Sequence, residues 1–111
     1  MTFKLKPGCY AAYKKAHDEL WPEIVAPMRD EGISMIIYHY EGRLFLHAEA
    51  PSREAFERSQ TGPDVARWHA YMATLMATDA EGQSIVEDLE VAFGFGRFAA
   101  VLGWAALRRR L

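Results

Sequence analysis

Apolar and polar residues alternate at the start of the chain with the two-residue period of a β-strand. Residues 2–6 place Phe3 and Leu5 on one face of an extended segment, and Pro7 and Gly8 then end it. We therefore predict a first strand over these residues.

A helical period follows from about Cys9. Tyr13 and His17 lie four residues apart and share one helical face, which Tyr10 and Leu20 continue. Such a face carries polar groups where packing alone would favour aliphatic side chains. Either hydrogen bonds satisfy these groups, or the groups line a pocket.

Pro22 predicts a break in this helix near Leu20-Trp21. Proline lacks an N–H and clashes with the preceding turn, but it suits the first turn of a new helix. We expect that second helix to run to about Asp30 and to end at Gly32. Its inward residues are Ile24, Val25 and Met28.

Residues 33–50 are rich in β-forming residues and predict a hairpin with its turn at Glu41-Gly42. On the first strand Ile33, Met35 and Ile37 face one way, and Ile36, Tyr38 and Tyr40 face the other. Both faces are largely apolar or aromatic, whereas a single layer of helices covers only one face of a sheet. We expect a second copy of the chain to cover the other, which predicts a homodimer.

The second half of the chain predicts two helices. The first runs from an N-cap at Ser52 through Ser59, with Phe56 as its anchor. The second starts at Thr61–Asp64, where Pro63 suits the first turn. Its buried stripe is Val65, Trp68, Met72 and Leu75.

A last strand is predicted over residues 84–93, with Ile85, Leu89, Val91 and Phe93 on one face. The element order is then β-α-β-β-α-β, the ferredoxin-like arrangement of the α+β class. We assign this fold to a single domain over residues 1–93. Residues 94–111 form an apolar tail with a basic end, which suits a short docked helix, a frayed tail, or a contact with a membrane surface or a partner.

Composition narrows the class of protein. The 111 residues are 50% hydrophobic with a formal net charge of -2, enough for one core and without the basic stripe of a nucleic-acid-binding protein. One cysteine, Cys9, excludes an intramolecular disulfide. The N-terminus lacks the apolar core of a signal peptide, and no apolar run is long enough to span a bilayer. We expect a cytoplasmic protein without nucleic-acid or membrane partners.

His17 is the first candidate for chemistry. A lone inward histidine is more often a satisfied core residue than a catalyst, but here Tyr13 and Trp21 each lie one turn away. Carboxylates at Asp18, Glu19 and Glu23 surround it in sequence. Histidine titrates near neutrality and moves protons in both directions.

Trp68 is the second candidate, because an indole offers a flat apolar surface with one N–H donor, which suits the C–H face of a sugar ring. We expect its neighbour His69 to point away and to lie on the surface or at an interface. His39 and His47 lie on strands without the spaced partners that a metal site needs.

Two blocks of sequence together resemble the L-rhamnose mutarotase family. The first is Tyr13-x-x-x-His17 followed by Leu20-Trp21-Pro22-Glu23, with Gly32 before the hairpin, and the second is Arg67-Trp68-x-x-Tyr71-Met72. The resemblance covers residues 1–93. It implies a dimeric ferredoxin-like α/β barrel that interconverts the anomers of a 6-deoxy sugar with no cofactor and no metal.

By this resemblance His17 is the acid/base residue, and Tyr13 and Trp68 hold the sugar. The family usually carries a tyrosine four residues after the glycine, where this chain has Ile36. Either Tyr38 or Tyr40, on the same strand face, supplies that hydroxyl, or the pocket is altered. The open alternatives are a cofactor-free monooxygenase of the same barrel architecture and a non-catalytic sugar-binding module.

Overall fold

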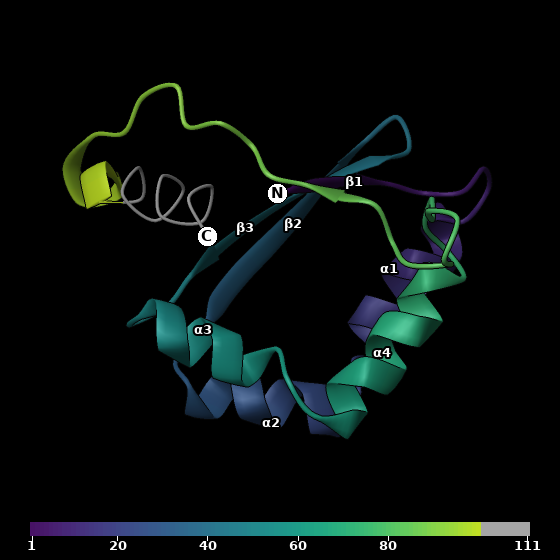
Figure 1. Cartoon of the computed structure of the whole chain (residues 1–111), viewed down its shortest axis with the longest axis horizontal. Coiled ribbons are helices and arrows are strands. Elements are labelled where there is room, and N and C mark those ends of the chain that lie inside the picture. Colours follow the sequence, from purple (N-terminus) through teal and green to yellow (C-terminus); the bar gives the residue numbers. More distant parts are fainter. Residues whose placement is uncertain (101–111) are drawn as a thin grey trace.

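The computed structural model describes residues 1–100, in which a four-stranded antiparallel sheet is covered by helices (Figure 1). The sheet order is β2-β3-β1-β4, the order of a ferredoxin-like fold, so the predicted α+β class is confirmed. The elements are β1 Thr2–Lys4, α1 Tyr10–Asp18, α2 Pro22–Asp30, β2 Ser34–Tyr40, β3 Arg43–Glu49, α3 Arg53–Ser59, α4 Pro63–Ala73, β4 Val86–Glu87 and the 3₁₀ helix η1 Gly96–Ala100.

Pro22 separates the first two helices as predicted. Helix α1 ends at Asp18, and α2 begins at Pro22, which occupies its first turn. Helix α2 ends near Gly32, whose φ of +70° is a backbone conformation that favours glycine. The break turns the chain, so that α2 packs against α3 and α4 (Figure 1). Between α1 and α4, the His17 ring meets the Trp68 ring edge-on at 5.2 Å.

The hairpin of β2 and β3 is the longest paired segment of the sheet. Glu41 and Gly42 both have positive φ, which matches the type I′ turns that join two twisted strands. The register pairs Ile36 with His47 and Tyr38 with Phe45. Directly paired residues share a face, so the predicted alternation along β2 is confirmed.

The last strand is much shorter than predicted. Strand β4 covers only Val86–Glu87, and Leu89 and Phe93 are 47% and 82% exposed. β4 pairs only with β1, which itself has three residues, so no partner strand continues beyond Glu87. The structure therefore has the predicted last strand, but only over Val86–Glu87 and not over the whole of residues 84–93.

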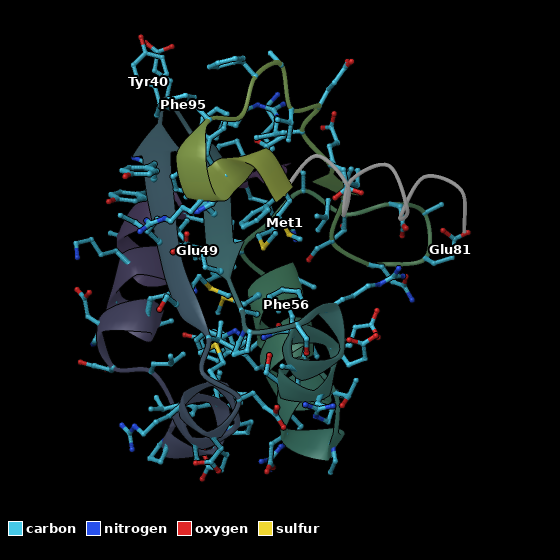
Figure 2. All side chains as sticks on the ribbon, turned by 90° about the vertical axis from the view of Figure 1, so that its left-hand side faces the viewer. Met1, Tyr40, Glu49, Phe56, Glu81 and Phe95 are labelled. Atoms are coloured by element: carbon cyan, nitrogen blue, oxygen red, sulfur yellow. The ribbon has the colours of Figure 1, made fainter. Side chains whose placement is uncertain are left out.

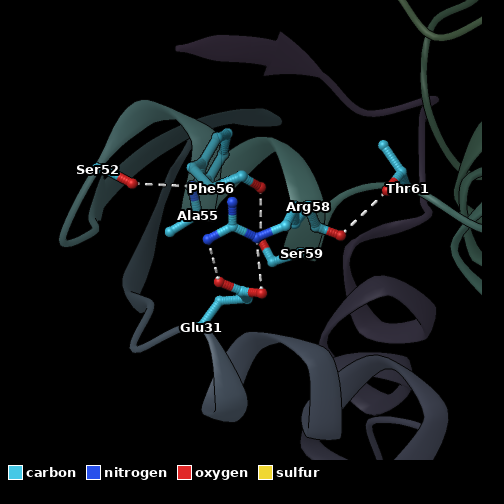
Figure 3. Close-up of polar contacts among 7 residues, drawn as sticks. All are labelled: Glu31, Ser52, Ala55, Phe56, Arg58, Ser59 and Thr61. Atoms are coloured by element: carbon cyan, nitrogen blue, oxygen red, sulfur yellow. Dashed lines mark hydrogen bonds and ion pairs between the residues drawn. The ribbon is translucent and has the colours of Figure 1, made fainter.

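Helix α3 is fixed at both ends by side-chain contacts (Figure 3). The hydroxyl of Ser52 accepts a hydrogen bond from the Ala55 N–H at 3.0 Å, as expected of an N-cap. The Arg58 guanidinium binds both carboxylate oxygens of Glu31, at 2.9 and 2.8 Å, and so connects α3 to the end of α2. The predicted anchor Phe56 is only half-buried, whereas Ala55 is fully buried.

The two faces of the sheet differ sharply. The hydrophobic core lies between the sheet and the helices, and its buried members are Phe3, Leu5, Tyr13, Ala16, Ile24, Leu44, Val65, Trp68, Met72 and Met76. The outer face carries Ile36, Tyr38 and Tyr40, all of which are exposed. A part of the chain's own tail reaches this side of β3, where Arg97 pairs with Glu49 at 3.1 Å (Figure 2).

The predicted tail over 94–111 lies only partly within the described residues. Gly96–Ala100 form the short 3₁₀ helix η1, and the Phe98 ring meets the His47 ring edge-on at 5.6 Å. The basic end of the tail lies outside the described residues.

Candidate functional site

A cavity of about 850 Å³ lies between the sheet and the helices. It is lined from α1 by Tyr13 and His17 and from α4 by Trp68 and His69. Met35 and Ile37 of β2 line it from the sheet. Three of the predicted site residues, Tyr13, His17 and Trp68, therefore line one cavity.

His17 is oriented by its own helix. Its Nδ1 lies 2.9 Å from the carbonyl oxygen of Tyr13. A carbonyl oxygen only accepts hydrogen bonds, so Nδ1 must carry the proton and donate it. In the neutral ring Nε2 then holds the lone pair, which makes this nitrogen the one able to accept a proton.

The aromatic rings pack closely around His17. Its ring lies 4.2 Å from that of Tyr13 and meets Trp68 edge-on at 5.2 Å. Trp21 packs edge-on against Trp68 at 5.1 Å, and Tyr71 packs against both tryptophans. This packing fixes the imidazole and the indole relative to each other.

Burial shifts the titration of the two polar groups on α1. It lowers the pKa of His17 below its usual value, because removal from water disfavours the imidazolium, and the bond to the Tyr13 carbonyl and nearby Asp18 only partly oppose this. Burial also strongly raises the pKa of the Tyr13 hydroxyl. At neutral pH the site therefore holds a neutral imidazole able to accept a proton and a phenol that keeps its O–H.

Tyr38 and Tyr40 lie elsewhere. They belong to the outer face of β2 with Ile36, and none of the three lines the cavity. Tyr38 is 60% and Tyr40 68% exposed, and Tyr40 lies at the tip of the hairpin (Figure 2). The chain does not bring either tyrosine to His17, because strand alternation directs Met35 and Ile37 to the cavity instead.

His69 is exposed, which agrees with the predicted surface position, but it also belongs to the cavity lining, which was not predicted. Partial burial lowers its pKa. The signal was present in the sequence, because His69 follows Val65 by four residues and precedes Met72 by three, which places it near their helical face.

The other histidines have local roles. The His39 ring stacks on Tyr10 at 3.7 Å, and its Nε2 accepts a hydrogen bond from the Gly42 N–H.

Within residues 1–100 no cluster of three histidine, cysteine or carboxylate side chains is placed to hold a metal ion. In the same part of the chain, no helix is long and apolar enough to cross a membrane.

Fold and cavity together define a small α+β protein with a histidine-bearing cavity between its sheet and its helices. The chain belongs to the L-rhamnose mutarotase family, whose sequence model matches residues 1–94. Members of that family are isomerases that act on carbohydrates, so the predicted class of enzyme is confirmed.

Relatives and a solved structure agree with this assignment. The chain is 33% identical to the L-rhamnose mutarotase of Rhizobium johnstonii over 93 residues, which are 81% of this chain and 88% of that protein. It is 34% identical to that of Brucella anthropi, with the same coverage. The crystal structure of an L-rhamnose mutarotase from Formosa agariphila superposes with a TM-score of 0.70 at 28% identity, over 86% of this chain and 94% of that one.

Proposed function

We propose that the protein interconverts the α and β anomers of L-rhamnose or a related 6-deoxy sugar, with His17 as the acid/base residue. One observation carries the proposal. The hydrogen bond from Nδ1 to the Tyr13 carbonyl leaves the Nε2 lone pair of a cavity-lining imidazole as the only basic site of the ring.

The reaction needs a net transfer of one proton. Nε2 of His17 takes the proton of the anomeric hydroxyl, and the resulting imidazolium gives a proton to the ring oxygen as the bond between that oxygen and the anomeric carbon breaks. The open-chain aldehyde turns about its next carbon–carbon bond. The reverse steps then close the ring with the anomeric hydroxyl on the other side, and His17 is again neutral.

Tyr13 and Trp68 hold the sugar in this proposal. The Tyr13 hydroxyl stays protonated and donates a hydrogen bond to a sugar oxygen, while the Trp68 indole packs on the C–H face of the ring. No metal or cofactor takes part. We further propose that the protein acts in the cytoplasm as a homodimer.

Exchange NMR between the two anomeric protons tests the function directly. L-Rhamnose should interconvert faster with the protein than in buffer alone, and His17→Ala should lose most of this acceleration while keeping its fold by circular dichroism. No acceleration for any 6-deoxy sugar would refute the proposal. Binding of the sugar without anomer exchange would instead favour the non-catalytic sugar-binding module.

A further inference from the structure

All five methionines of the chain line the cavity. They come from the start of the chain, α2, β2, α4 and the segment after α4, and they are Met1, Met28, Met35, Met72 and Met76. We refer to these five residues as the methionine wall. The tyrosines are distributed differently, since only Tyr13 of the five in the chain lines the same cavity.

The cavity lining also lacks charged side chains. Among the described residues, none of those lining the cavity is an aspartate, glutamate, lysine or arginine. The side chains of the lining that carry a polar atom are Tyr13, His17, Ser59, Gln60, Trp68, His69, Gln83 and Ser84. Several of them already make hydrogen bonds within the chain. The Ser59 hydroxyl donates to the Phe56 carbonyl at 2.6 Å, and the Gln60 side chain donates to the Ser59 hydroxyl at 3.3 Å. The Ser84 hydroxyl donates to the Met76 sulfur at 3.9 Å, and His17 is bonded to the Tyr13 carbonyl as described above. A bare sugar carries hydroxyl groups around its ring, and the methionine wall offers those groups no strong hydrogen-bond partner.

The size of the cavity also favours a ligand with an apolar group in addition to its sugar ring. Its volume of about 850 Å³ lies in the upper part of the range of roughly 300–1,000 Å³ that holds drug-sized ligands. A single six-membered sugar ring occupies only part of such a space. Apolar walls left without a partner forfeit dispersion contacts, which an apolar group on the ligand would restore.

We propose that the preferred ligand is a 6-deoxy sugar that carries an apolar O-alkyl group, such as a methyl ether, and keeps its anomeric hydroxyl free. The sugar ring lies against His17 and Trp68, and the alkyl group packs on the methionine wall. Methionine is unbranched, flexible and polarizable, so the wall adapts to an alkyl group at more than one ring position. This inference rests on the proposed mutarotase function and deepens it.

Two separate readouts test it. NMR titration gives the dissociation constants of L-rhamnose and of its 2-, 3- and 4-O-methyl ethers, and exchange NMR gives their rates of anomer interconversion. At least one ether should bind about fourfold more tightly than L-rhamnose, the factor that corresponds to about 0.8 kcal/mol for one buried methyl group. If every ether binds no more tightly than L-rhamnose, the inference is overturned.

The rates decide the underlying function independently. Faster anomer exchange of L-rhamnose without tighter binding of any ether leaves the mutarotase function standing and refutes the inference alone. Tighter binding of an ether with no acceleration for any sugar refutes the mutarotase function and supports the ligand preference of the cavity.

A pair of variants locates the preference within the cavity. Met35 is 37% exposed, so Met35→Gln keeps the length of the side chain and adds an amide without disturbing the buried core. It should bring the ratio of the two dissociation constants close to one. Leu89→Gln, at a 47% exposed position outside the cavity, should keep the wild-type ratio. If Met35→Gln does not fold, Met28→Gln on α2 repeats the test, and an unchanged ratio in the folded variant overturns the inference.

Discussion

At the scale of single residues, one helical hydrogen bond decides what His17 can do. The four-residue spacing from Tyr13 was enough to predict that both side chains share a face. The sequence was not enough to predict the protonated nitrogen, because this depends on the rotamer that brings Nδ1 to the Tyr13 carbonyl. The same limit applies to Tyr38 and Tyr40. Strand alternation predicted that they share a face, but not that this face lies away from the cavity.

The lowered pKa of His17 predicts how activity depends on pH. If neutral Nε2 starts the reaction, the rate rises with pH as the imidazolium loses its proton and then levels off. Because burial moves the pKa below the usual value of 6.5, the plateau should already be reached at neutral pH. Rates from exchange NMR across acidic and neutral pH check this. A rate that falls as the pH rises towards neutrality would contradict the role of the neutral ring.

Tyr13 predicts a milder loss than His17. Tyr13→Phe keeps the buried ring beside His17 and removes only the hydroxyl, so kcat/KM should fall by roughly 2- to 10-fold, the value of one hydrogen bond. Tyr10→Phe is the matched control, because Tyr10 lies on the same helix but outside the cavity lining. It should leave kcat/KM unchanged. Equal losses of kcat/KM in the two variants would show that the Tyr13 hydroxyl does not bind the sugar.

At the scale of elements, the sequence correctly predicted the positions where a helix breaks and a hairpin turns. It did not predict how far the strand at the edge of the sheet extends. Pro22 ends the first helical segment because its ring restricts the backbone, and the hairpin turns at Glu41-Gly42 because glycine tolerates positive φ. The length of β4 depends instead on how far β1 extends beside it. That is a property of the tertiary pairing, and the apolar alternation over 84–93 carried no information about it.

The N-cap of α3 predicts a measurable loss of stability. Ser52→Ala removes the acceptor of the Ala55 N–H, so the free energy of unfolding should fall by about 1 kcal/mol. Urea denaturation followed by circular dichroism measures this change. Ser34→Ala, at an exposed position at the start of β2, should change the free energy of unfolding by less than about 0.5 kcal/mol. An unaltered midpoint for Ser52→Ala would show that the cap does not stabilise α3.

At the scale of the whole molecule, the outer face of the sheet leaves large apolar side chains exposed. The apolar alternation on both faces of β2 was visible in the sequence, and the structure leaves Ile36, Tyr38 and Tyr40 exposed. Arg97 pairs with Glu49 and Phe98 packs against His47 at one side of this face. An exposed apolar surface of this kind marks an interaction site, and we expect a second copy of the chain to cover it.

Charges placed on this face should therefore separate the dimer. Ile36→Lys combined with Tyr38→Lys puts two cations where two copies would bury apolar surface, and like charges facing each other across the interface repel. Sedimentation equilibrium should give twice the mass of one chain for the wild type and the mass of one chain for the double variant. Tyr10→Lys is the control, because this partly exposed tyrosine lies on α1 at the helical side of the sheet, and it should remain dimeric. A wild-type protein that sediments as a monomer at every concentration would refute the predicted dimer. A double variant that stays dimeric would show that the interface lies on another surface.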